Sequence, residues 1–160
     1  MAEDGTDAPP SAGRWHYELV GHCSASRQVL WPLLASAERW KDWSFLTRSF
    51  LLRQGQPEPD GVGALRRFAV GPFGSVEEVV AFEPPRHLGY VGRRGLPVRS
   101  YRADVVLDED GSGTRLTWRG SLTPLVPGTG PLVLAGTRAA VARFLPQLIR
   151  FADGPGAAGA

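Results

Sequence analysis

The sequence has little cysteine and almost no lysine, and each scarcity narrows what the protein can be. Cys23 is the only cysteine among 160 residues, so no disulfide can form within the chain. Positive charge comes almost entirely from arginine, Lys41 is the only lysine, and the formal net charge is only +2. Because basic and acidic residues are interspersed along the chain, the sequence does not predict a nucleic-acid-binding surface.

Targeting and membrane segments are also missing. Residues 1–14 are acidic and polar and contain no apolar stretch of the kind found in a signal peptide. No uninterrupted apolar run approaches the roughly 20 residues that a membrane-spanning helix needs. Together with the single cysteine, which suits a reducing compartment, this predicts a soluble cytoplasmic protein with no membrane span.

Motifs for metals, nucleotides and activated nucleophiles are missing as well. No group of His, Cys, Asp and Glu has the spacing of metal ligands. The glycines near 92–95 lack the pattern of a dinucleotide or phosphate loop, and no Gly-x-Ser-x-Gly motif occurs. We therefore expect no metal and no cofactor.

The most informative segment that is present lies between residues 76 and 118. Strand-like runs alternate there with turn sequences at 84–85, 95–97 and 108–113, which predicts an antiparallel meander. Apolar residues occupy both faces of several of these strands. A flat sheet with one wet face would not show this, so we expect a strongly curved sheet wrapped around something.

The rest of the chain completes an α+β pattern in one domain. Residues 131–152 carry apolar side chains every three or four positions and predict one long amphipathic helix, bent at Pro146. Two short helices are expected after the first strand, over 27–35 and 36–43, and Pro32 should delay, kink or split the first of them. Low-complexity, disordered tails are expected at 1–13 and 154–160, around a domain over 14–153. The predicted strands cover residues 15–23, 49–54, 64–70, 76–82, 88–93, 101–107 and 114–122.

This order and several local phrases resemble the START-like superfamily, also called the polyketide cyclase/dehydrase and lipid-transport (SRPBCC) family. The phrases are SASRQVLWPLLASAERWKDWS, DGVGALRRF, EEVVAFEPPRHLGY and DEDGSGTRLTW, followed by the closing helix. The resemblance covers about residues 15–152. It implies a helix-grip fold, in which a curved antiparallel sheet of about seven strands grips a long C-terminal helix around an apolar cavity.

In such a fold, one face of each strand and the apolar stripe of the helix would line the cavity. Aromatic walls suit flat apolar ligands, although the same side chains could simply fill a core. The expected ligand-binding residues are Trp31, Trp40, Trp43, Phe45, Phe68, Phe73, Glu78, Tyr90, Tyr101, Ala103, Val105, Leu116, Trp118, Val141, Phe144, Leu145 and Leu148.

Arg66 and Arg67 are adjacent in a predicted strand, so one of them must face the concave side. If the turn at 71–74 closes its hairpin symmetrically, Arg67 lies opposite Glu78 on the same face. An inward arginine needs a partner because an unpaired buried charge is costly, and either Glu78 or a ligand oxyanion would serve. The alternative is a surface or structural ion pair.

Three functions remain open from the sequence. The first is binding of a small hydrophobic or aromatic molecule of polyketide, lipid or sterol type in the cavity. The second, which the resemblance implies, is a polyketide aromatase/cyclase or dehydratase. There Arg66 or Arg67 would polarise a carbonyl and Tyr90 or Tyr101 would donate a proton. The third is a non-catalytic protein-interaction module. The sequence allows either a monomer or a homodimer.

Overall fold

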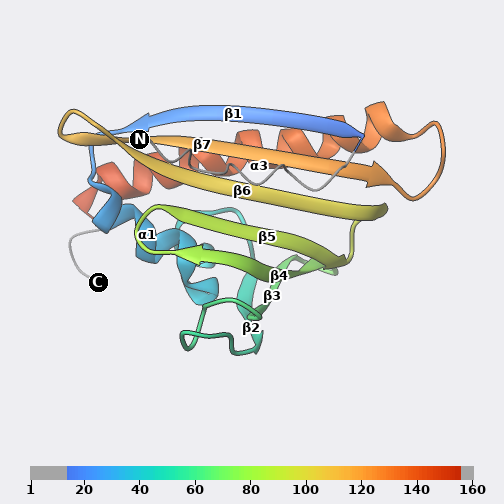
Figure 1. Ribbon diagram of the computed structural model, residues 1–160, viewed down its shortest axis with the longest axis horizontal. Helices are drawn as coiled ribbons and strands as arrows, with labels where there is room; N and C mark the ends of the chain where they lie inside the picture. The colour runs from blue at the N-terminus through green and yellow to red at the C-terminus, as the bar shows by residue number, and fades with distance from the viewer. Residues whose placement is uncertain (1–13, 156–160) are drawn as a thin grey trace, which may run out of the picture.

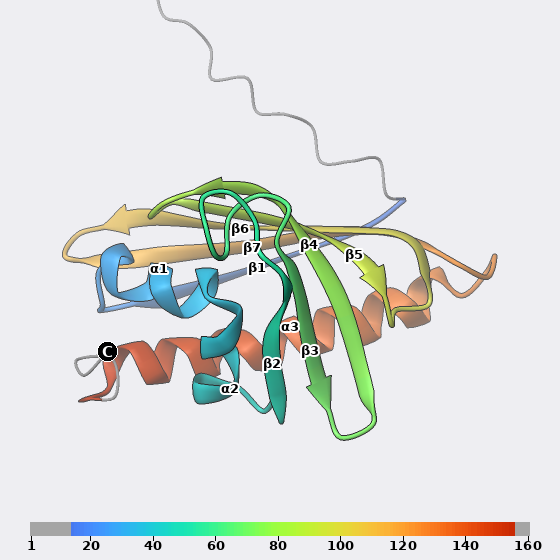
Figure 2. The same ribbon diagram turned by 90° about the horizontal axis from the view of Figure 1, so that it is seen from below.

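The computed structural model describes residues 14–155, which form a seven-stranded antiparallel sheet curved around one long helix (Figures 1 and 2). The predicted tail residues 1–13 and 156–160 lie outside the described residues. In chain order the elements are β1 (Trp15–Cys23), α1 (Arg27–Ala35), η1 (Ala37–Arg39), α2 (Trp40–Trp43), β2 (Arg48–Arg53), β3 (Leu65–Val70), β4 (Phe73–Glu83), β5 (His87–Arg94), β6 (Val98–Asp110), β7 (Gly113–Pro124) and α3 (Gly130–Asp153).

Strands β2 to β7 form an antiparallel meander, and β1 extends the sheet by pairing with its last strand. Its order is β1-β7-β6-β5-β4-β3-β2, so each strand from β2 to β7 pairs with the next, and β1 pairs with β7. The α1 and α2 segment lies near the C-terminal end of α3, below the sheet in Figure 2. The predicted α+β class, the element order and the grip of the sheet on the C-terminal helix are thereby confirmed.

The structure differs from the sequence predictions at three places. The predicted turn at 108–113 is much tighter, because β6 continues to Asp110 and Gly111 adopts a φ of 61° that a two-residue hairpin turn requires. The second predicted helix, 36–43, is divided into η1 and α2. Pro32 lies within α1, which begins at Arg27 as one helix, so this proline neither delays nor splits the helix.

Helix α3 packs closely against β1 because Gly21 has no side chain to separate them. A Cβ at Gly21 would lie 2.7 Å from Cδ1 of Ile149 and 3.1 Å from a methyl group of Leu145. From Val141 onward α3 buries Val141, Leu145 and Leu148 against the sheet, whereas residues 131–140 include no buried residue. The helix is therefore anchored at one end and more open at the other.

By length and composition alone, α3 is apolar enough to cross a membrane, and it is the one such helix within residues 14–155. The prediction that no segment reaches this length did not count the helix as a whole, because arginines interrupt its apolar runs. In the fold, α3 is the core helix that the sheet grips, and its apolar stripe packs against β1 and β7.

Gly120 in β7 is a second position where a missing side chain allows close packing, here on the concave face of the sheet. It pairs with Tyr17 of β1 on one side and with Ala103 of β6 on the other. The Tyr17 ring lies across Gly120, in the space that a Cβ would fill, and its hydroxyl lies 2.6 Å from that of Tyr101 in β6. The missing side chain allows an aromatic ring to span a strand.

We predict that Gly120→Ala destabilises the fold by about 1–3 kcal/mol, because the new methyl group must displace the Tyr17 ring from a packed interior. Gly136→Ala is the matched control. Gly136 is exposed in α3, and a methyl group added there would meet no other atom within 4 Å, so alanine should be neutral or stabilise by up to about 1 kcal/mol. Urea unfolding measures both, and equal stability of the two variants would contradict the packing assigned to Tyr17.

Candidate ligand-binding site

The concave face is built from one parity of each strand. In β6 and β7, Tyr101, Ala103, Val105, Leu116 and Trp118 are all buried there, whereas Arg115 and Arg119 between them are exposed. This alternation follows from the two-residue period of a strand. From α3, the predicted residues Val141, Leu145 and Leu148 are buried beneath the same face.

An aromatic cluster occupies the side of this interior next to α2. Phe144 of α3 lies at its centre, stacked on Phe45 at 4.7 Å and on Trp118 at 6.3 Å between ring centres. Trp40 contacts Phe144 edge-on and packs on Phe68 of β3 at 4.7 Å. The structure therefore brings together six residues that the sequence predicted separately: Trp40, Trp43, Phe45, Phe68, Trp118 and Phe144.

A charged pair lies inside the sheet beside this cluster. The Arg66 side chain is fully buried, and its Nη2 donates to Oε2 of Glu77 at 3.1 Å. Its guanidinium carbon lies 5.0 Å from the ring centre of Tyr90 and 5.1 Å from that of Phe68. Aromatic faces attract a cation in this range, so they partly replace the water that burial removes.

A row of hydroxyl groups continues from this pair across the sheet. Tyr90 accepts a hydrogen bond from Nε1 of Trp118 at 3.1 Å, and the Tyr17 and Tyr101 hydroxyls are hydrogen-bonded to each other at 2.6 Å. Burial raises the pKa of all three tyrosines well above the usual value, so they stay protonated and remain donors. The concave face thus carries a polar line within an apolar wall.

Three hydrogen-bond donors on this polar line have no acceptor within residues 14–155. Nε of Arg66 is buried without a partner. The proton of Tyr90 has no acceptor, because Tyr90 serves only as the acceptor for Trp118. In the pair of Tyr17 and Tyr101, one proton makes the shared bond and the other is unused. Buried donors are normally satisfied, so three unused ones on one wall call for an explanation.

The register of β3 and β4 corrects the prediction for Arg67 and Glu78. Arg66 pairs with Glu77, and Arg67 pairs with Val76, because the turn between the strands is tighter than the symmetric closure at 71–74 assumed. Glu78 lies on the convex side, where it accepts from Nε of Arg93 at 2.7 Å. Arg67 shares that convex face, so Arg66 is the arginine that points inward.

One further predicted residue, Phe73, lies away from the concave wall, whereas Trp31 packs within the buried core. Phe73 is 80% exposed at the start of β4, because it sits at the tip of the β3–β4 hairpin beyond the reach of the core. Trp31 is buried in α1, where its ring packs edge-on against Phe82 at 5.2 Å. Sequence reasoning also missed Tyr17 and Glu77. The alternation of Trp15, Tyr17 and Leu19 in β1 was the available signal for Tyr17.

The wall is less closed toward the start of α3. Leu96 and Val98, around the β5–β6 connection, and Val133 and Leu134 in α3 pack against the core but remain only half-buried. The sequence of segment 92–97, Gly-Arg-Arg-Gly-Leu-Pro, fits either a flap over the mouth of a cavity or an ordinary hairpin connection. It lies at this more open end.

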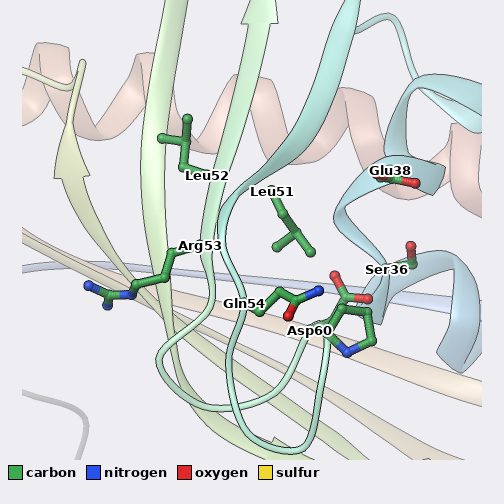
Figure 3. A pocket seen from close by; sticks show the side chains of 8 residues that line it. Ser36, Glu38, Leu51, Leu52, Arg53, Gln54 and Asp60 are labelled. Carbon is green, nitrogen blue, oxygen red and sulfur yellow. The ribbon is translucent and has the colours of Figure 1, made fainter.

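A separate pocket of about 450 Å³ lies outside the gripped interior, between β2 with its following loop and the segment from α1 to η1 (Figure 3). Asp60 points toward it and accepts a hydrogen bond from the backbone of Ala37 at 3.0 Å. Burial raises the pKa of Asp60. None of the predicted site residues lines this pocket; its lining is Ser36, Glu38, Leu51, Leu52, Arg53, Gln54, Pro59 and Asp60.

The curved sheet, the gripped helix and the lined concave face define the helix-grip class of proteins, and comparison with known proteins agrees. XoxI from Bacillus cereus has a TM-score of 0.71 at 18% identity, over 85% of this chain and 94% of that one. A START superfamily protein from Mycobacterium smegmatis has a TM-score of 0.69 at 15% identity, over 84% and 97%. Ara h 8.0201 has a TM-score of 0.70 at 8% identity, over 86% and 96%.

The family itself follows from a sequence model. The model described as polyketide cyclase / dehydrase and lipid transport matches residues 14–152, nearly the whole described chain. The chain belongs to this family. Among curated proteins, none matches the sequence.

We predict that Glu77→Gln destabilises the fold by about 3–5 kcal/mol, because it leaves the Arg66 guanidinium buried without a counter-charge. Glu78→Gln is the matched control. It removes the neighbouring carboxylate, whose partners Arg53 and Arg93 are more than half exposed, and should cost no more than about 1 kcal/mol. Thermal and urea unfolding of both variants test this, and a larger loss in the Glu78 variant would contradict the assigned register.

Proposed function

We propose that the protein binds a small, largely apolar or aromatic molecule that carries acceptor oxygens, between the concave face and the first half of α3. The observation that carries this proposal is the set of unused donors on the wall: Nε of Arg66, the hydroxyl of Tyr90 and one hydroxyl of the Tyr17–Tyr101 pair. A carbonyl, enolate or carboxylate oxygen would satisfy them. The surrounding apolar residues would contact the rest of the ligand.

The family is consistent with a hydrophobic ligand. The half-buried Leu96, Val98, Val133 and Leu134 support entry at the end of the molecule where α3 begins, because apolar side chains there are packed on one side only. The C-terminal half of α3 and the aromatic cluster are closely packed, so they would form the floor and side wall of the site.

A second candidate, cyclase or dehydratase chemistry, is favoured by the Arg66–Glu77 pair. A donor group at Arg66 and Tyr90 would polarise a carbonyl and supply a proton to its oxygen as a carbon nucleophile of the same ligand attacks the carbonyl carbon. Burial raises the pKa of the Glu77 carboxyl, which suits it to take up the proton lost from that nucleophilic carbon. Loss of water would then follow from the alcohol formed.

We predict that wild-type protein binds the fluorescent probe anilinonaphthalene sulfonate, an aromatic anion with acceptor oxygens, at one site per chain. The double variant Arg66→Met/Glu77→Gln should weaken this binding about tenfold or more, because a hydrogen bond from a charged donor is lost. The double change removes both charges at similar volume, so the variant should remain folded. Fluorescence titration measures the affinities and circular dichroism checks the fold.

Arg67→Gln is the control, because Arg67 lies next to Arg66 but on the convex face. Wild-type affinity is expected for this variant. If it weakens binding as much as the double variant does, or if the double variant binds like wild type, the polar line is not the recognition element. Formation of a dehydrated product from a linear aryl polyketone, detected by mass spectrometry and abolished in the double variant, would favour the enzyme over the binder.

A further inference from the structure

Three apolar side chains are exposed together where β7 passes into α3. Leu125 is 52% exposed, Val126 56% and Leu132 77%, and all three lie within eight residues of the chain. We refer to Leu125, Val126 and Leu132 as the end patch. Large apolar residues are normal on a surface when scattered, but a group at one projecting loop indicates an interaction site.

The end patch lies at an extremity of the molecule. In both views, the loop between β7 and α3 projects beyond the sheet, at the end opposite α1 and the C-terminus of α3 (Figures 1 and 2). The backbone N–H of Leu125 donates to the carbonyl of Pro97 at 3.0 Å, which places the β5–β6 connection beside this loop. Two neighbouring connections therefore form this end of the protein.

The chain segments that build this end contain arginine but no acid. Residues 84–103 and 111–152 hold neither Asp nor Glu. Exposed Arg94 and Arg99 each lie within three residues of Pro97, the residue that bonds Leu125. Among the described residues, Arg94 and Arg99 form no ion pair with an acid, whereas Arg93 pairs with Glu78 and Arg27 with Glu109. In the part of the chain that the structure describes, this end thus combines protruding apolar side chains with two exposed arginines that have no acidic partner.

We propose that the end patch docks on an anionic membrane surface. Protruding Leu and Val side chains can enter the boundary between headgroups and acyl chains, while Arg94 and Arg99 contact the phosphates and negatively charged headgroups around them. The positive charge of Arg94 and Arg99 is complementary to an anionic leaflet. This docking is independent of whether the concave face binds a ligand.

The test is flotation of the full chain with vesicles of phosphatidylcholine alone and of phosphatidylcholine mixed with phosphatidylserine. Wild-type protein is expected to float with the mixed vesicles and to be released by high salt, since the electrostatic part is screened. The variant Leu125→Gln/Val126→Gln/Leu132→Gln should lose about tenfold or more in affinity for them. Arg94→Gln/Arg99→Gln should also bind less and should lose most of the salt dependence.

Leu52→Gln is the matched control, because Leu52 is 52% exposed like Leu125 but lies in β2, the far edge strand of the sheet. It should float like wild type, and circular dichroism should show every variant folded. Failure of wild-type protein to float with anionic vesicles would overturn the proposal. So would wild-type flotation of the triple glutamine variant, or an equal loss in Leu52→Gln.

Discussion

The charged pair of Arg66 and Glu77, held inside the sheet, is the constraint on which much of the structure depends. Removing two ions from water costs several kcal/mol each, so the surrounding fold must supply compensating contacts. The aromatic faces of Trp40, Phe68 and Tyr90 and the carbonyl of Leu34 provide them. These groups come from four different segments, so the pair specifies how β3, β5, α1 and α2 meet. A slip of one residue in β3 would turn Arg66 to the convex side and bring Arg67 inward.

The same interior carries polar groups that a core alone would not need. An apolar wall alone would need no hydroxyl row, yet Tyr17, Tyr90 and Tyr101 extend the polar line from β4 across to β1. Gly120 makes this row possible, since any side chain there would exclude the Tyr17 ring. The fold therefore preserves donors at a cost in packing freedom and in unsatisfied hydrogen bonds. Such a cost is typical of a site that a ligand completes.

Much of this could be predicted from the sequence, because the strands alternate in burial and the last helix has a clear apolar stripe. The inward parity of Tyr101 to Leu107 and of Leu116 and Trp118 followed from that period. The choice between Arg66 and Arg67 did not, since it depends on where a hairpin turn closes, and both neighbours are the same residue type, as are Glu77 and Glu78. Phe73 was predicted inside because hydrophobicity does not reveal that β4 begins at a hairpin tip beyond the edge of the core. The line of unused donors depends on side chains from four strands and is visible only in three dimensions.

The most direct test of the account is native mass spectrometry of the protein purified from its own host, followed by extraction and identification of what it carries. The account predicts one molecule per chain, apolar or aromatic in its body and carrying carbonyl, enolate or carboxylate oxygen. A protein that emerges empty and does not take up such compounds when they are added would contradict it. A stoichiometric hydrocarbon ligand without acceptor oxygens would contradict the role given to Arg66 and the tyrosines.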